Sequence, residues 1–247
     1  MKTLYILAIA AIVLQSCSMS KDDNGGEIAT GEGGSLARFT ISNDHLYIVG
    51  ENNLSTYSLP ADGSAPEREN TLELNFGAET VFPYDNNHLL LGTQDGMYVI
   101  DISTPAQPLK KTLFQHIRSC DPVVAENGFA YITLNANSMR CWRGLNEMQI
   151  VDIHNLSDPY LVKSYTMGNP QGLDIHNDTL YVCDGGLKML DVKNKYNPYE
   201  LAYFPEVQPT DVIYTQGRLL LIGSDGFNQY RIAGNTITKI SSLPIEP

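Results

Sequence analysis

Length, composition and charge limit what this chain of 247 residues can be. It carries 16 Lys and Arg against 28 Asp and Glu, which gives a formal net charge of −12. So acidic a chain has no electrostatic reason to bind nucleic acid, because binding there depends on Lys and Arg that neutralise phosphates. The charge also predicts repulsion from anionic membrane surfaces, except through local patches.

The first residues have the features of a processing signal rather than of a fold. Lys2 is followed by an uncharged apolar run of eleven residues, Leu4 to Leu14. A membrane span needs about 20 apolar residues, so the run fits the core of a signal peptide better. The next residues, Leu14-Gln15-Ser16-Cys17, resemble a bacterial lipobox, which implies removal of residues 1–16 and lipidation of Cys17. A plain signal peptide with an unrelated cysteine is the alternative.

Residues 17–34 are polar and rich in glycine, a composition typical of a flexible tether. Lys21-Asp22-Asp23 resembles the surface-export signal of Bacteroidetes lipoproteins. This resemblance implies a protein anchored by lipid in the outer membrane and exposed at the cell surface. A periplasm-facing anchor is the alternative.

From residue 36 onward, short apolar runs alternate with turn residues, which predicts an all-β structure. One strand recurs with a terminal Asp at positions 101, 152 and 191, and degenerate copies align at Ser58 and Arg231. A second apolar strand precedes each copy. Asp-Gly turns, which favour short hairpins, join the two strands in three copies. These turns are Asp95-Gly96, Asp184-Gly185 and Asp225-Gly226.

An opening strand and a closing strand complete each unit, so that four strands recur about every 40 residues, five times. This pattern predicts a single five-bladed β-propeller with four antiparallel strands per blade. A solenoid of sheets is the alternative. The predicted blades cover about residues 35–74, 75–116, 117–167, 168–206 and 207–247. We expect the ring to close between whole blades through packing, unless Ile28 to Thr30 adds an edge strand.

Strands such as Ile150-Val151-Asp152-Ile153 resemble the LVIVD repeat. The resemblance covers roughly residues 36–247 and implies a β-propeller of the kind found on bacterial surface or secreted proteins. It implies no established catalytic activity.

Aligned units predict which side of each opening strand is buried between blades. The residues expected there are Phe39 and Ile41, Phe82 and Tyr84, Val123 and Ala125, Leu173 and Ile175, and Val212 and Tyr214. The opposite side and the channel mouth then collect polar residues as a candidate binding site. These are Arg38, Glu79, Asp121, Gln171, Asp174 and Asp211. The alternative is that they only satisfy strand ends and water.

The third unit contains a long insertion that is expected at the same mouth. Arg140, Trp142 and Arg143 lie in it, and Trp142 is the only tryptophan of the chain. Arg and Trp are favoured for stacking on sugars or for anchoring a partner, although Trp142 folded over the channel as a plug is the alternative. A disulfide between Cys120 and Cys141 would tie this loop down in an exported protein.

The cysteine and histidine spacings match no zinc motif, and no phosphate-binding loop or nucleophile motif occurs, so we expect no metal and no cofactor. We therefore predict a non-enzymatic surface lipoprotein whose propeller binds a glycan or a protein. The alternatives are a glycosidase-like enzyme that uses carboxylates at the mouth, and a structural protein without a ligand.

Overall fold

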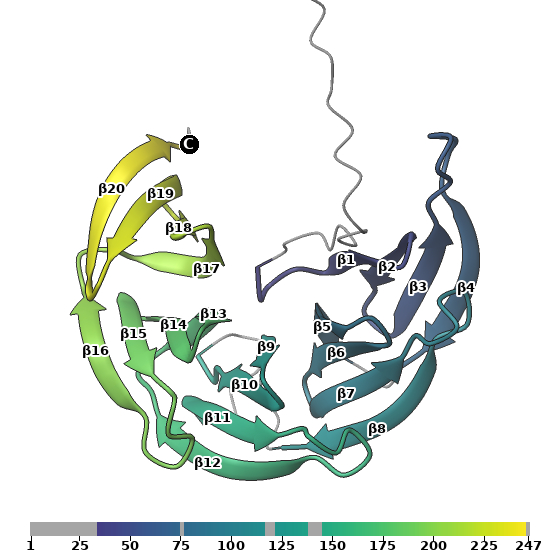
Figure 1. Cartoon of the computed structure of the whole chain (residues 1–247), viewed down its shortest axis with the longest axis horizontal. Helices are drawn as coiled ribbons and strands as arrows, with labels where there is room; N and C mark the ends of the chain where they lie inside the picture. Colours follow the sequence, from purple (N-terminus) through teal and green to yellow (C-terminus); the bar gives the residue numbers. More distant parts are fainter. Residues whose placement is uncertain (1–33, 75–76, 117–121, 138–144, 246–247) are drawn as a thin grey trace, which may run out of the picture.

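The computed structural model describes residues 34–74, 77–116, 122–137 and 145–245. In these ranges all regular structure is β-strand, arranged as five sheets of four antiparallel strands. Figure 1 shows the sheets placed like blades around an axis, which confirms the predicted propeller architecture. The described part of the chain includes no helix of the length and hydrophobicity that crossing a membrane requires.

In every sheet the strands follow one another in chain order from the axis outward. The first blade consists of β1 (Phe39–Ser42), β2 (His45–Val49), β3 (Asn53–Ser58) and β4 (Glu67–Glu73). The second consists of β5 (Ala78–Asp85), β6 (His88–Thr93), β7 (Gly96–Asp101) and β8 (Leu109–Gln115). The third consists of β9 (Val123–Glu126), β10 (Phe129–Leu134), β11 (Glu147–Asp152) and β12 (Tyr160–Thr166).

The remaining two blades repeat the same arrangement. The fourth consists of β13 (Pro170–His176), β14 (Thr179–Asp184), β15 (Leu187–Asp191) and β16 (Tyr199–Phe204). The fifth consists of β17 (Pro209–Thr215), β18 (Arg218–Gly223), β19 (Gly226–Ala233) and β20 (Thr236–Leu243).

Tight turns join the first and second strands of most blades. In four blades both central residues have positive φ, for example 51° and 58° at Asn43-Asp44 and 50° and 59° at Asn177-Asp178. Two consecutive positive φ angles define a type I′ turn, whose twist matches that of a β-hairpin and which Asn, Asp and Gly tolerate best. The turn residues therefore fix where each opening strand ends.

Consecutive blades pack through apolar side chains on both faces of each sheet. One cluster joins the first and second blades, with Tyr47 and Leu54 against Leu89 and Leu91. Equivalent clusters join the second blade to the third, the third to the fourth and the fourth to the fifth. A sheet covered on both faces has most of its apolar surface removed from contact with water. This burial stabilises the fold by about 25 cal/mol per Å² of apolar surface. These four interfaces hold the arc together.

The predicted inner faces are confirmed in three blades and differ in the other two. Val123, Leu173 and Val212 are fully buried, as expected. In the second blade a β-bulge near Pro83 shifts the register, so that Val81 faces the preceding blade while Phe82 packs on the other side. In the first blade Phe39 is 60% exposed, because no blade covers it.

The expected closure of the ring through packing is not found among the described residues. Figure 1 shows a wide gap between the fifth and first blades, and the four clusters include none that spans it. The two blades approach each other only near the axis, where Ser35 donates a hydrogen bond to Asp211 at 3.1 Å. Together with the hydrogen bond from the Leu36 N–H to Asp211, this contact links the first and fifth blades among the described residues.

The repeated Asp of the third strand stabilises the turn that follows it. Asp101, Asp152 and Asp191 each accept a hydrogen bond from the backbone N–H two residues later, at 2.8–3.0 Å. This is an Asx turn, in which a carboxylate replaces a backbone acceptor. Hydrogen bonds from the hydroxyl and the N–H of Ser103 lower the pKa of Asp101. The Asp of the repeat is therefore a folding residue.

Replacement of this Asp tests the role. Asp152→Ala removes the acceptor of the His154 N–H and of the Tyr160 hydroxyl, and we expect the free energy of unfolding to fall by about 1–3 kcal/mol. Asp158→Ala makes the same charge change at an exposed position of the same turn and should leave it nearly unchanged. Urea unfolding measures both, and equal losses would contradict the role.

Candidate functional site

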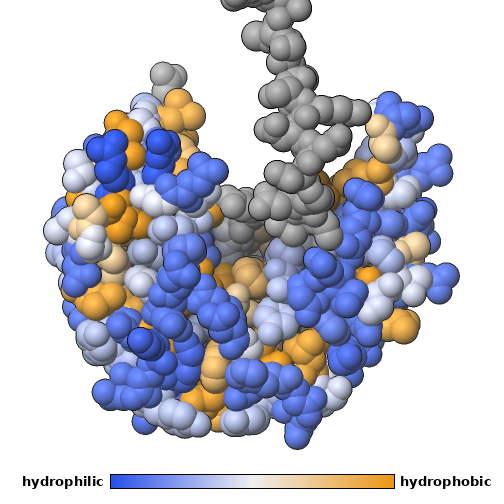
Figure 2. Space-filling model, in the orientation of Figure 1, coloured by the Kyte–Doolittle hydropathy of each residue, from blue (hydrophilic) through white to orange (hydrophobic). Residues whose placement is uncertain are grey.

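The mouth face is the end of the propeller that carries the second-to-third strand hairpins and the connections between blades. Figure 2 shows that the viewed side is mainly hydrophilic. The sequence places six candidate residues at this mouth, of which the structure describes Arg38, Glu79, Gln171, Asp174 and Asp211.

Asp211 is buried near the axis and joins three blades. Its Oδ1 accepts hydrogen bonds from the Ser35 hydroxyl at 3.1 Å and from the Val212 N–H at 3.0 Å. Its Oδ2 accepts one from the Leu36 N–H at 3.4 Å. The Ser35 hydroxyl oxygen in turn accepts a hydrogen bond from the Leu173 N–H at 2.8 Å. A Cβ at Gly172 would overlap Asp211 Oδ1, so glycine is required there for the close approach. Asp211 and Ser35 thus connect the fifth, first and fourth blades near the axis.

Asp174 joins the fourth and fifth blades in a similar way. It accepts hydrogen bonds from the Ile175 N–H at 2.8 Å and from the Tyr214 N–H at 2.5 Å. The second contact connects β13 to β17, so that the carboxylate satisfies a backbone donor of the neighbouring innermost strand. Such charge-assisted bonds to backbone groups position strands and leave less of the carboxylate for a ligand.

Of the other three described candidates, Arg38 and Glu79 contact the protein through their side chains and Gln171 through its backbone carbonyl. Arg38 donates weakly to the carbonyl oxygens of Val49 and Ala78, at 3.4 and 3.3 Å, and so ties the first blade to the second. Glu79 accepts a hydrogen bond from Gln94 at 3.2 Å. The Gln171 carbonyl accepts one from the Thr133 hydroxyl at 2.6 Å. These polar groups fasten blade to blade or strand to hairpin.

Several predicted residues lie outside the described part of the chain. They are Cys17, Cys120, Asp121, Arg140, Cys141, Trp142 and Arg143, together with the tether. The ends of the insertion are described. Asn135 donates to the Pro170 carbonyl at 2.6 Å and Asn146 to the Gly168 carbonyl at 2.7 Å. Both ends of the insertion are therefore held against the connection between the third and fourth blades, on the mouth face.

A pocket of about 290 Å³ lies on the mouth face where the fourth blade meets the fifth. Sequence reasoning missed it. Its lining is mainly polar, with two carboxylates, a lysine and a tyrosine. The residues are Glu206, Val207, Gln208, Pro209, Leu221, Gly223, Ser224, Asp225, Asn228, Tyr230 and Lys239. Burial raises the pKa of the Tyr230 phenol, and the negative charges of Asp225 and Glu206 raise it further.

The pocket arises where the fifth blade departs from the fourth. In the fourth blade, Asp184 accepts hydrogen bonds from the N–H groups of Gly168 and Asn169 and pairs with Lys188 at 2.7 Å. Strand register places Gly223 and Asn228 at the equivalent positions of the fifth blade. The ion pair that fills this place in one blade is therefore missing from the next.

Asn228 is the residue of the pocket with an unmet hydrogen-bonding need. It is 5% exposed, and its Nδ2 donates to Asp225 at 3.0 Å. Its Oδ1 is buried and has no hydrogen-bond partner among the described residues. A buried acceptor without a donor costs about 1–3 kcal/mol. The repeat carried a signal for this site, namely glycine and asparagine where the preceding blade has the ion pair.

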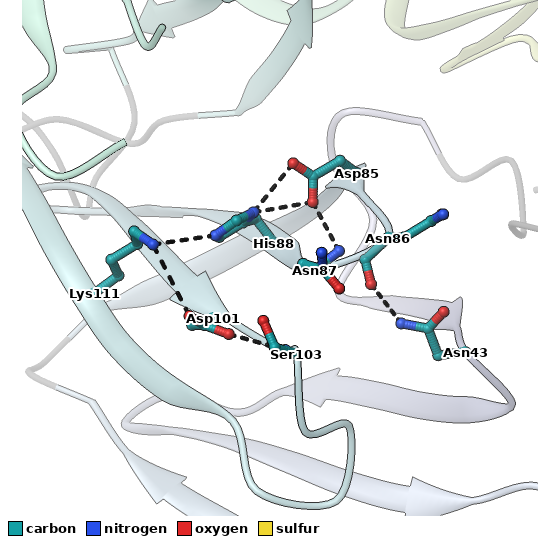
Figure 3. Close-up of polar contacts among 8 residues, drawn as sticks. All are labelled: Asn43, Asp85, Asn86, Asn87, His88, Asp101, Ser103 and Lys111. Atoms are coloured by element: carbon teal, nitrogen blue, oxygen red, sulfur yellow. Dashed lines mark hydrogen bonds and ion pairs between the residues drawn. The ribbon is translucent and has the colours of Figure 1, made fainter. Parts of the chain in front are cut away.

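A second polar cluster lies at the opposite end of the second blade (Figure 3). His88 contacts Asp85 at 3.0 Å, Lys111 lies 3.4 Å from the other nitrogen of His88, and Lys111 is 3.9 Å from Asp101. These groups satisfy one another around a turn. Among the described His, Cys, Asp and Glu residues, no group of three or more is arranged to hold a metal ion.

Comparison with known families supports the repeat. The family model described as the LVIVD repeat matches residues 87–114 and 143–167. The chain therefore carries LVIVD repeats, in the second and third blades of the propeller. No curated protein matches the chain.

Solved structures of similar shape are propellers. A putative 6-phosphogluconolactonase from Bacteroides fragilis matches with a TM-score of 0.67 at 11% identity, over 84% of this chain and 70% of that one. A functionally unknown protein from Desulfotomaculum acetoxidans matches with a TM-score of 0.66 at 10% identity, over 84% and 69%. The N-terminal domain of Nup159 matches with a TM-score of 0.52 at 13% identity, over 84% and 62%. At these identities the likeness concerns the fold alone.

The buried Asp211 predicts a pH dependence of stability. Burial raises its pKa from 3.8 to about 6. Between about pH 4 and 6 the folded state therefore holds a proton that the unfolded chain has lost, so this residue's contribution to stability falls as the pH rises through that window. From pH 4 to pH 7, the unfolding free energy of the unchanged chain should fall by roughly 1–3 kcal/mol more than that of Asp211→Asn, because the variant has no carboxyl group to titrate. Parallel pH profiles for the two chains would contradict it.

Proposed function

We propose that this protein is a non-enzymatic binding protein of the cell surface, held by a lipid on Cys17, with its ligand site on the mouth face. The observation that carries the proposal is the pocket between the fourth and fifth blades. There Gly223 and Asn228 stand where the fourth blade has the Asp184–Lys188 ion pair, and polar side chains line the space.

The lining favours a ligand rich in hydroxyl groups, such as a glycan. Glu206 and Asp225 offer carboxylate oxygens that accept hydrogen bonds, while the Lys239 ammonium donates them. Tyr230 adds an aromatic side chain, which is suited to contact with a sugar ring. The mixed acceptors and donors match hydroxyls, which both donate and accept, better than they match a ligand of one charge. The insertion with Arg140, Trp142 and Arg143 starts and ends on the same face and would extend the contact surface.

A carbohydrate-active enzyme is the second candidate, since two carboxylates at a suitable separation hydrolyse glycosidic bonds. The carboxylates of Asp174 and Asp211 do not favour the enzyme, because their oxygens accept hydrogen bonds from backbone groups of neighbouring blades. The name of the Bacteroides fragilis structure mentions a lactonase, and its 11% identity transfers no activity. Release of reducing sugar from an oligosaccharide that the protein binds would favour the enzyme.

Substitution of Asn228 separates binding from folding. We expect Asn228→Leu to weaken glycan binding about tenfold or more, because Asn228 lines the pocket and its Nδ2 holds the Asp225 carboxylate in place. The free energy of unfolding should stay level or rise by about 1 kcal/mol, since an unsatisfied polar group leaves the interior. Titration against a panel of neutral oligosaccharides measures the first effect and urea unfolding the second.

Matched lysines provide the control for this experiment. Lys239→Ala should also weaken binding, because Lys239 lines the pocket. Lys163→Ala removes a lysine from the equivalent outermost strand of the third blade and should leave binding unchanged. Equal binding by all of these variants would exclude the pocket as the ligand site.

The anchor is tested independently of the ligand. Cys17→Ala should abolish incorporation of labelled palmitate and move the protein from the membrane fraction to the soluble fraction, because a diacyl anchor holds a protein where a single chain is marginal. Protease treatment of intact cells then distinguishes an outward-facing protein from a periplasm-facing one. Unchanged labelling of the variant would show that Cys17 is not the lipidated residue.

A further inference from the structure

The fourth blade holds an ammonium group at the place that the pocket leaves open in the fifth. Lys188 Nζ lies 2.7 Å from Asp184 Oδ2 and 5.4 Å from the centre of the Tyr203 ring. Strand register makes Asn228 the equivalent of Lys188. The fourth blade therefore shows which chemical group fills this place when the chain itself supplies it.

The fifth blade keeps the carboxylate of this arrangement but not its cation. Asn228 Nδ2 donates to Asp225 Oδ2 at 3.0 Å, where Lys188 contacts Asp184 in the fourth blade. A Cβ at Gly223, the equivalent of Asp184, would lie 3.1 Å from Asp225 Oδ1. The hairpin thus returns a carboxylate close to the point where the Asp184 side chain begins. A neutral amide stands where the ammonium would balance it.

Further acceptors surround this carboxylate. Glu206 adds a second carboxylate to the lining, and the Gln208 carbonyl oxygen lies 2.6 Å from the position of a Cβ at Gly223. The negative charges of Asp225 and Glu206 raise the pKa of the Tyr230 phenol beyond the effect of burial. The potential in this part of the pocket is therefore negative, which disfavours a ligand that carries a carboxylate.

Among the described residues that line the pocket, Lys239 is the one lysine or arginine. It comes from β20, opposite Tyr230 across the strand pair. In the described part of the chain no ion pair joins it to Asp225 or Glu206. Two carboxylates and one ammonium give the lining a formal charge of −1. A single ammonium group from a ligand would balance this charge.

We propose that the pocket recognises a primary ammonium group, so that its ligand is a glycan with a free amino sugar. The ammonium takes the place of the Lys188 ammonium and donates to the Asp225 carboxylate, with the Gln208 carbonyl as a further acceptor. An ammonium has three donors and no acceptor, and its bonds to carboxylates are stronger than those of neutral hydroxyls. The inference rests on the proposed function, since it names the ligand class of the same pocket.

Three sugars that differ only at carbon 2 test the inference, namely glucosamine, N-acetylglucosamine and glucose. They are titrated into the full chain by NMR at about pH 6, where an amine of this kind is protonated. We expect glucosamine to bind about tenfold more tightly than the other two. This preference should shrink as added salt screens the charges. Equal binding of the three sugars, tighter binding of a neutral one, or no binding of glucosamine would overturn the inference.

Variants place the preference in the pocket. Asp225→Asn should abolish it, because the carboxylate partner of the ammonium is lost. Asn228→Lys should also abolish it, because an ammonium of the chain then lies beside Asp225, as in the fourth blade. Asp95→Asn makes the same charge change in the equivalent two-residue hairpin of the second blade and should keep the preference. Thermal unfolding confirms that each variant is folded. A preference that survives both Asp225→Asn and Asn228→Lys would overturn the inference.

The inference and the proposed function fail in different ways. If neutral oligosaccharides bind and Asn228→Leu weakens them, but glucosamine is not preferred, the pocket remains a glycan site and the ammonium inference is wrong. If glucosamine is preferred through Asp225 and no oligosaccharide binds, the ammonium site stands and the glycan-binding function is wrong.

Discussion

Every blade of this protein is a sheet with apolar side chains on both faces, and such a sheet is stable only when both faces are covered. Tyr47 and Leu54 of the first blade, for example, are buried only because Leu89 and Leu91 of the second lie against them. Each blade thus depends on its neighbours, as in other repeat proteins. The two terminal faces are the places where this dependence is not satisfied within the described residues.

The polar groups near the axis solve a related problem. The innermost strands of neighbouring blades lie close together, so water has little access to their backbone N–H groups. These donors need hydrogen-bond acceptors from the protein itself. Asp174 and Asp211 provide these partners, and Gly172 makes room for the second of them. Carboxylates that resemble a binding site in the sequence therefore serve as connectors in the structure. The pocket of the fifth blade is the reverse case, since Gly223 and Asn228 replace the Asp184–Lys188 ion pair of the fourth blade and the place stays open.

Much of the fold was predictable because its causes are local. The alternation of apolar residues and the recurring Asp define four strands per unit, and the Asp-Gly hairpins define how two of them pair. The bulge near Pro83 was not predictable, since one extra residue in a strand changes its facing without changing its composition. The pocket had a signal in the repeat, at Gly223 and Asn228, but that substitution shows an open space only once the strand register is known.

The sequence by itself determined the all-β class, the five units, and the burial of Val123, Leu173 and Val212 against a neighbouring blade. These features were predictable because strand periodicity is a property of a few consecutive residues. It also contained the lipobox-like Cys17. Only the tertiary structure decided that the described parts of the first and fifth blades do not pack on each other, that Asp211 is buried, and that Phe39 and Ile222 are exposed. These outcomes depend on the angle between packed sheets, and that angle is set by the sum of all contacts in four interfaces rather than by any local pattern.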